Sequence, residues 1–425
     1  MLLLPGCSSN QAGSGMGGVL LALLVALVAA KLGGELFVRL GQPAVLGELI
    51  LGIVVGNLSL AGVHALEFVR HDPSLEILAQ IGIILLLFQV GLESDFRKMR
   101  QVGLSSLAAA VLGVLASFAL GWAVAALLLP GSGIYRQVFV GVVIASSSIG
   151  IAGRIFLDLG RLQTPEARVV LGAAVIDDMI GLIGLTIVTA IVIGAGTGEP
   201  AGWLSIGAVV VGAIAFPVGA VLLGSRLVPA VMRVAAHMKA SDLLLTASLG
   251  LCFGFSYLAH VVGLAPIIGA FAAGLVLEEV HWRGFVERGE HSVKELMSPL
   301  VGFLAPIFFF ATGARVDLSV FGDSQVWTLA IALAVAAILG KQFCGLGVFQ
   351  RGVSKLSVGI GMIPRGEVVL IAAALGSKLI IEGKPIVSST VYSAAVFVVV
   401  ITTIITPPLL KWSLSRRRQT GAAQP

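Results

Sequence analysis

Charged residues are scarce in this 425-residue sequence, at 12% of the chain. An ordinary soluble domain carries roughly twice that share, and the mean hydropathy of +1.05 lies far on the apolar side. This composition excludes a disordered tail and a nucleic-acid-binding protein. Three cysteines are too few for a secreted disulfide scaffold, and Cys252 and Cys344 lie inside apolar runs, which indicates buried thiols.

What the sequence does contain is thirteen apolar runs, most of them long enough to span roughly 30 Å of hydrocarbon. No stretch between them is long enough for a soluble domain. We therefore expect an all-α polytopic membrane protein with one membrane domain at 16–412, a leader at 1–15 and a short basic tail at 413–425. The runs at 44–58 and 265–280 are the shortest. The predicted spans are 16–38, 44–58, 75–92, 103–129, 137–159, 167–194, 202–228, 242–262, 265–280, 296–313, 325–349, 357–380 and 386–412.

The basic residues predict how these spans are oriented. With the N-terminus outside, the inner loops hold twenty of the 27 Lys and Arg residues. The outer loops hold only Arg70, Arg136, Arg315, Lys378 and Lys384. This bias follows the positive-inside rule. We therefore expect a cytoplasmic C-terminus, and we interpret the small net charge of +5 as orientation in a bilayer rather than binding of a polyanion.

Two short patterns recur seven spans apart. Glycines five residues apart occur at 47 and 52 and again at 269 and 274, and a Phe, Gly and Asp set occurs at 88, 91 and 95 and again at 310, 313 and 317. Because seven is odd, the second copy enters the bilayer from the opposite side. The pattern predicts an inverted repeat, with repeat 1 at 16–194, a linker helix at 202–228 and repeat 2 at 242–412. Many secondary transporters are built in this way.

Two spans in corresponding positions contain residues that weaken a helix. One carries Ser146, Ser147 and Ser148 followed by Ile-Gly, and the other carries Pro364 among three glycines. Proline removes a backbone donor and obstructs the preceding turn, and irregular backbone inside a membrane occurs only next to protein or a watery cavity. We expect two discontinuous, crossed helices here. The alternative is that these residues only kink the helices for packing.

The adjacent acids Asp177 and Asp178 are the strongest chemical feature. Their helix is expected to begin at Thr164-Pro165-Glu166, a cap, N1 proline and first-turn acid. The acids then lie roughly 17–20 Å along it. An acid at that depth costs about 2.5–3.5 kcal/mol unless it faces a cavity or a partner. Burial disfavours the ionised carboxylate, which suits a group that exchanges a proton for a cation. The alternative is a wrongly placed acid pair at a helix end.

Lys341 is the expected counter-charge, because it lies about 12 Å from the inner end of its span. Its alternative is snorkelling to the interface. Arg365 and Glu367 flank the predicted break, where they are expected to offset the partial charges of half-helix ends or to pair with each other. The alternative is direct contact with the ion.

Hydroxyl and carboxylate oxygens complete the candidate site. The hydroxyls of Ser147 and Ser148 are candidate ligands for a small hard cation, together with Asp178. Serines in membrane helices also bond to backbone, which is the alternative. No role is assigned to Glu48.

Several segments together resemble the monovalent cation:proton antiporters, in the branch of Kef-type and sodium/proton exchangers. They are GQPAVLGE at 41–48, LLFQVGLE at 86–93, GAFAAG at 269–274 and PRGE at 364–367. The resemblance extends from about residue 20 to 412. It implies a homodimer in a bacterial plasma membrane, elevator-like alternating access, a role in pH homeostasis, and no cofactor other than the transported Na⁺ and H⁺.

Carried over by position, the resemblance also implies residue roles. Asp178 looks like the essential ion- and proton-binding carboxylate, and Asp177 like the neighbour found in electrogenic members. Lys341 resembles the lysine that pairs with that neighbour. Ser147 and Ser148 occupy the place of the family's Thr-Ser pair beside the ion. The implied activity is exchange of Na⁺ or Li⁺ for H⁺, by a protein that is not an enzyme.

Two rival functions fit part of this pattern. A Kef-type K⁺/H⁺ antiporter commonly carries a nucleotide-binding regulatory domain, and this chain continues only briefly after Arg416 without a dinucleotide fingerprint, which favours sodium. An intramembrane aspartyl protease needs two aspartates that face one water from two helices. Asp177 and Asp178 are neighbours about 100° apart on one helix, which disfavours the protease.

Overall fold

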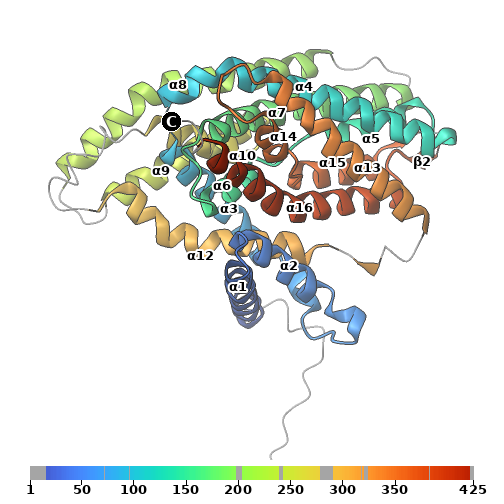
Figure 1. Ribbon diagram of the computed structural model, residues 1–425, viewed down its shortest axis with the longest axis horizontal. Helices are drawn as coiled ribbons and strands as arrows, with labels where there is room; N and C mark the ends of the chain where they lie inside the picture. The colour runs from blue at the N-terminus through green and yellow to red at the C-terminus, as the bar shows by residue number, and fades with distance from the viewer. Residues whose placement is uncertain are drawn as a thin grey trace, which may run out of the picture. The chain divides into compact units, whose positions relative to one another are not determined.

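The computed structural model describes residues 16–70, 72–94, 96–197, 203–238, 243–277, 291–316, 318–319, 324–381 and 383–421. These residues form a fold made almost wholly of helices, with one two-stranded hairpin (Figure 1). The elements are α1 (Met16–Arg39), α2 (Ala44–Gly56), η1 (Leu58–Ala61), η2 (Glu67–Arg70), α3 (Pro73–Glu93), α4 (Phe96–Leu128), η3 (Pro130–Ser132), α5 (Ile134–Ala145), α6 (Ile149–Asp158), α7 (Pro165–Thr197), α8 (Trp203–His237), α9 (Leu243–Val261), α10 (Pro266–Val276), α12 (Val293–Ala314), α13 (Ser324–Gln342), η6 (Phe343–Gly347), α14 (Lys355–Gly361), α15 (Glu367–Lys378), β1 (Ile380–Ile381), β2 (Lys384–Pro385) and α16 (Ser389–Gly421).

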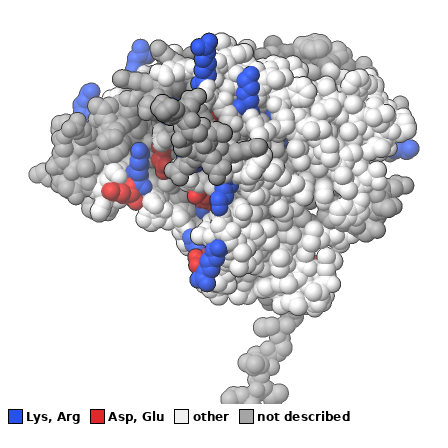
Figure 2. Space-filling model, in the orientation of Figure 1, with Lys and Arg blue, Asp and Glu red and all other residues white. Residues whose placement is uncertain are grey.

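Each of the thirteen predicted spans coincides with one helix or with a pair of short helices. Within the described residues, nine helical segments are long and apolar enough to cross a membrane, and α2 and α10 are shorter. On the face drawn in Figure 2, the described charged side chains form a few small groups on a surface that is otherwise uncharged. The predicted all-α polytopic membrane fold is thus confirmed, while the number of crossings stays a prediction. Helix α16 continues to Gly421, beyond the predicted end of the last span.

The chain divides into two compact units. Unit 1 comprises the chain up to Leu86 together with Ser298–Ser319, and unit 2 comprises Leu87–Met297 and the chain from Val320 onward. The boundary falls inside α3 and inside α12, not between the two predicted repeats. The repeat limits expected from the sequence stay a prediction, as does the leader at 1–15, which lies outside the described residues.

In unit 1, glycines let α2 approach two other helices. A Cβ on Gly33 of α1 would overlap the carbonyl oxygen of Gly47, and a Cβ on Gly52 would overlap that of Phe310 on α12. Glu48, to which no role was assigned, is buried on the same helix. The glycine steps noticed in the sequence are therefore sites where backbones meet.

In unit 2, the equivalent glycines make equivalent contacts. A Cβ on Gly269 of α10 would overlap the carbonyl oxygen of Phe255 on α9, and a Cβ on Gly274 would overlap that of Phe88 on α3. In the predicted repeat, α10 corresponds to α2 and α12 corresponds to α3. Helix α2 packs on α12, and its counterpart α10 packs on α3. This exchange of partners is expected of an inverted repeat. Asp95 and Asp317, the last members of the recurring pattern, lie outside the described residues.

The helices around the predicted site pack within unit 2. Helix α4 contacts α5, α7 and α13, and α13 contacts α16. The short helices α14 and α15 lie along α16 (Figure 1). The two spans predicted to be discontinuous are interrupted, at 146–148 between α5 and α6 and at 362–366 between α14 and α15. The crossing of these helices stays a prediction.

Candidate functional site

The acid pair lies deep within α7. This helix begins where the sequence indicated, because the Thr164 hydroxyl accepts a hydrogen bond from the Ala167 N–H at 3.3 Å and Pro165 is its first residue. Asp177 and Asp178 follow about 18–20 Å along the helix axis. Their exposed fractions are 0% and 1%. The alternative of an acid pair at a helix end is therefore wrong.

The interruption between α5 and α6 places backbone groups against Asp177. The N–H of Ser147 donates to Asp177 Oδ2 at 2.5 Å, and the Ser147 hydroxyl donates to the Met362 carbonyl at 2.8 Å. The N–H of Ser148 donates to the Pro364 carbonyl at 2.8 Å. The two interrupted helices are thus hydrogen-bonded to each other through their gaps, and the first gap also holds one acid.

The Ser148 hydroxyl has a local structural task. It accepts a hydrogen bond from the Ile151 N–H at 3.4 Å and so caps α6. This is the backbone bonding that was weighed as the alternative to cation binding. Its oxygen keeps a further lone pair, because a hydroxyl can accept two hydrogen bonds.

Ser146 begins the same gap and was not among the predicted ligands. Its hydroxyl oxygen is buried and has no hydrogen-bond partner among the described residues. It lies against Gly181 on α7, one turn beyond the acids, where a Cβ would collide with it. A buried oxygen with unused lone pairs suits an ordered water or a cation.

Lys341 reaches Asp177 from α13. Its ammonium group forms an ion pair with Asp177 Oδ1, and both side chains are fully buried. Gly113 on α4 leaves room for the neighbouring Cys344, because a Cβ there would collide with the Cys344 sulfur. Lys341 therefore does not snorkel, and the counter-charge expected for the acid pair is in place.

Arg365 occupies the second gap and is fully buried. Its guanidinium group donates to the carbonyls of Ala145 at 2.9 Å and Ser146 at 2.5 Å. It also reaches Ser117 Oγ on α4 at 3.3 Å and the Ala337 carbonyl on α13 at 3.2 Å. The last carbonyls of a helix carry partial negative charge. Arg365, in the gap between α14 and α15, thus offsets the partial negative charge at the C-terminal end of α5.

The backbone of Arg365 is held by α16. Its N–H donates to Thr402 Oγ1 and its carbonyl accepts from Thr403 Oγ1, both at 3.2 Å. Sequence reasoning did not include these residues, although two adjacent hydroxyls in an apolar run are a usable signal. Glu367 begins α15, but its side chain lies outside the described part of the chain, so its pairing with Arg365 stays a prediction.

The structure therefore brings Asp177, Ser147 and Lys341 into direct contact. Asp178 lies next to them on α7, and Arg365 joins through the carbonyl of Ser146. The described residues contain no cluster of three or more His, Cys, Asp or Glu side chains. The donors gathered here are carboxylate, hydroxyl and carbonyl oxygens, which suit a hard, weakly held cation.

The sequence matches the family described as sodium/hydrogen exchanger, transmembrane, over residues 19–416. This chain belongs to that family. The family is one of membrane transporters, so the protein is a transporter and not an enzyme, and the protease alternative is wrong.

Two antiporters are similar to this chain over almost their whole length. The high-affinity Na⁺/H⁺ antiporter NhaS3 of Synechocystis is 33% identical, over 93% of this chain and 90% of that protein. The Na⁺/H⁺-K⁺ antiporter GerN of Bacillus cereus is 34% identical, over 92% and 95%. The structure of the sodium proton antiporter MjNhaP1 from Methanocaldococcus jannaschii shares the fold, with a TM-score of 0.69, 17% identity and coverage of 97% and 100%.

Proposed function

We propose that this exchanger moves sodium ions against protons across a bacterial plasma membrane, with Asp178 as the group that binds either one. The observation that carries the proposal is the buried acid pair, of which Asp177 is already bound by Lys341 and the Ser147 N–H. Adjacent residues point about 100° apart on a helix. Asp178 therefore points away from the ion pair that Asp177 forms with Lys341.

Burial makes the two ligands compete. An ionised carboxylate is costly in a low-dielectric interior unless a positive charge accompanies it, whereas its protonated form is neutral. Asp178 is therefore stable with a proton or with a cation, and binding one expels the other. Oxygens near the gap complete the cation's shell, with the unpartnered hydroxyl of Ser146 as one ligand and Ser147 and Ser148 as the others.

The Asp177–Lys341 pair supports an electrogenic cycle. In this proposal the buried pair carries a second exchangeable proton, next to the cation that Asp178 binds. If one cation displaces a proton from Asp178 and a second proton leaves this pair, each cycle moves net charge. A site with Asp178 alone would exchange one cation for one proton and would move no net charge.

Alternating access is the remaining part of the proposal. The gaps are bonded to each other, and the residues of the site belong to one compact unit. Those features support an elevator mechanism, in which one unit carries the whole site across the membrane. The homodimer and the inside position of the C-terminus are proposed from the family resemblance and from the distribution of Lys and Arg.

Potassium remains a second candidate cation, because the name of GerN includes K⁺. The deciding experiment uses purified protein in proteoliposomes with an imposed pH gradient, and it tests Na⁺, Li⁺ and K⁺ separately. Sodium is expected to drive proton movement at the lowest concentration. Full exchange with potassium and none with sodium would reverse the assignment.

Variants at two aspartates test the site. Asp178→Asn is expected to abolish cation-driven proton movement, because an amide cannot exchange a proton for a cation. Asp158→Asn makes the same chemical change on α6, where the carboxylate pairs with Arg154 at 2.8 Å, and it is expected to retain exchange. Full activity in Asp178→Asn would remove the central residue from the proposal.

A further inference from the structure

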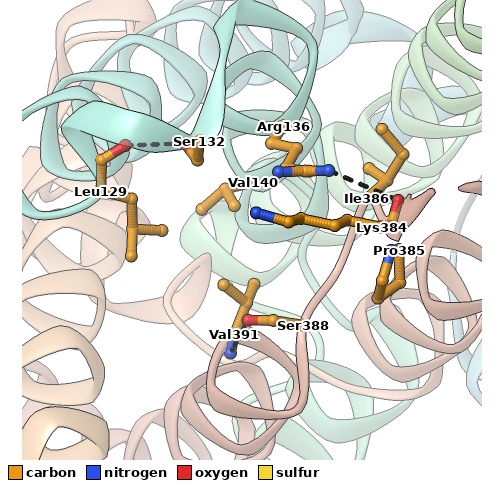
Figure 3. A pocket seen from close by; sticks show the side chains of 9 residues that line it. All are labelled: Leu129, Ser132, Arg136, Val140, Lys384, Pro385, Ile386, Ser388 and Val391. Carbon is orange, nitrogen blue, oxygen red and sulfur yellow. Dashed lines mark hydrogen bonds between the residues drawn. The ribbon is translucent and has the colours of Figure 1, made fainter. Parts of the chain in front are cut away.

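A cavity of about 210 Å³ lies outside the acid site, at the end of α4 where α5 and α16 begin (Figure 3). The hairpin of β1 and β2, which joins α15 to α16, forms one wall. Nothing in the proposed exchange cycle uses this cavity. Its lining combines basic, hydroxyl and apolar side chains.

Two cations face the cavity. The Arg136 guanidinium group donates to the carbonyls of Ile381 at 3.2 Å and Lys384 at 3.4 Å, and its buried Nε has no hydrogen-bond partner. Figure 3 shows the Lys384 side chain extending across the cavity, below that guanidinium group. Neither cation lies within 4.0 Å of a carboxylate of any described residue. Glu382, in the same hairpin, lies outside the described residues.

Neighbouring like charges repel, and an anion between them removes that cost. Two hydroxyls also line the cavity, those of Ser132 and Ser388. Ser388 precedes the 33-residue helix α16 and accepts a hydrogen bond from the Val391 N–H at 3.3 Å. The N-terminus of a long helix favours negative charge. Cations, hydroxyls and helix end together suit a phosphate group.

The rest of the lining and the surroundings are apolar. Leu129 and Ile386 line the cavity beside the cations. Around it, Leu127, Ile134 and Ile380 are 78%, 52% and 65% exposed, as side chains in contact with lipid are. Tyr135, the residue before Arg136, is also exposed, and tyrosine is common where a membrane meets water. The cavity therefore lies at a membrane surface, where a phosphate group arrives attached to acyl chains.

We propose that this cavity binds the phosphate group of an anionic phospholipid, with Arg136 and Lys384 as its two cationic contacts. The bound headgroup bridges the start of α5 and the hairpin that follows α15. It thereby stabilises the first turns of α5 and the end of α15. This proposal rests on the membrane-spanning fold and not on the identity of the transported ion.

The test measures lipid binding to purified protein by native mass spectrometry, with dioleoylphosphatidylglycerol and dioleoylphosphatidylcholine titrated separately. Wild type is expected to bind one phosphatidylglycerol tightly and phosphatidylcholine weakly. Arg136→Gln combined with Lys384→Gln is expected to bind phosphatidylglycerol roughly tenfold to thirtyfold more weakly, because each basic residue near the surface contributes to anionic lipid affinity. Equal binding by wild type and this double variant would overturn the proposal.

Two further variants separate charge from folding. Lys378→Gln removes an exposed cation at the end of α15, outside the cavity, and is expected to bind like wild type. Arg136→Lys keeps the charge and is expected to retain most of the affinity, so that loss in both Arg136 variants would count against the proposed contact. Inorganic phosphate tests for a soluble anion. If it displaces the lipid at millimolar concentration in wild type, the lipid assignment is refuted.

Discussion

Replacing Lys341 by glutamine breaks its ion pair with Asp177 but keeps a long polar side chain in place. Both groups are fully buried, so the remaining carboxylate loses its counter-charge without gaining water. Breaking a buried pair in this way costs about 3–5 kcal/mol. For a chain of 425 residues, the entropy of unfolding is so large that a loss of 1 kcal/mol lowers the thermal midpoint by only roughly 1 °C. A fall of about 3–5 °C in the thermal midpoint is therefore expected.

The two single variants are expected to differ in their pH dependence. Lys341→Gln leaves a carboxylate that ionises as pH rises, so this variant should lose stability toward high pH. Asp177→Asn leaves an amine that is charged at low pH, so that variant should lose stability toward low pH. The double variant Asp177→Asn with Lys341→Gln contains no buried charge in the pair and should recover most of the loss.

Thermal unfolding of the detergent-solubilised variants between pH 5 and 9 measures these effects. The same proteins in liposomes, with a potential-sensitive dye, measure charge movement, which is expected to fall in Lys341→Gln. Parallel pH profiles for the two single variants, or a double variant whose loss equals the sum of the singles, would refute the reasoning. Either outcome would mean that the pair does not interact as the geometry indicates.

Two further predictions concern the scaffold. Arg365→Gln removes hydrogen bonds to the carbonyls of Ala145 and Ser146 at the end of α5, each worth about 1.5–3 kcal/mol for a charged donor, so the yield of folded protein should fall. Arg365→Lys should fail to rescue it, because an ammonium group cannot reach several helices as a guanidinium does, and wild-type yield in that variant would contradict this role. Gly274→Ala should cost about 1–3 kcal/mol, because its Cβ meets the Phe88 carbonyl, whereas Gly254→Ala, with nothing within 4 Å, should leave the thermal midpoint unchanged in the same melting assay.

Much of the fold was predictable because the bilayer imposes simple requirements on a sequence. A span must be apolar over a fixed length, so the runs coincide with helices. A proline removes a backbone donor, so Pro364 marks an interruption. A lysine deep in an apolar helix needs an opposite charge; the family resemblance implied Asp177 as that partner, and the structure places Lys341 against Asp177.

Contacts made by backbone atoms were not predictable, because a carbonyl has no signature in the sequence. The partners of Arg365 are mostly carbonyls, so its reach from α14–α15 to α5 could not be anticipated. The same holds for the capping task of Ser148. Arg136 and Lys384 were placed on one side of the membrane by loop charge, but their meeting depends on the fold, because 248 residues separate them.

The link between the two gaps has a consequence for how such a site diversifies. Ser148 and Pro364 are joined through an N–H and a carbonyl, not through side chains. Any residue except proline supplies that N–H, and every residue supplies that carbonyl. Substitution at these positions therefore keeps this backbone link, although the cap that the Ser148 hydroxyl gives to α6 is lost with that side chain. The same backbone framework can in this way be kept in related proteins that differ in cation selectivity.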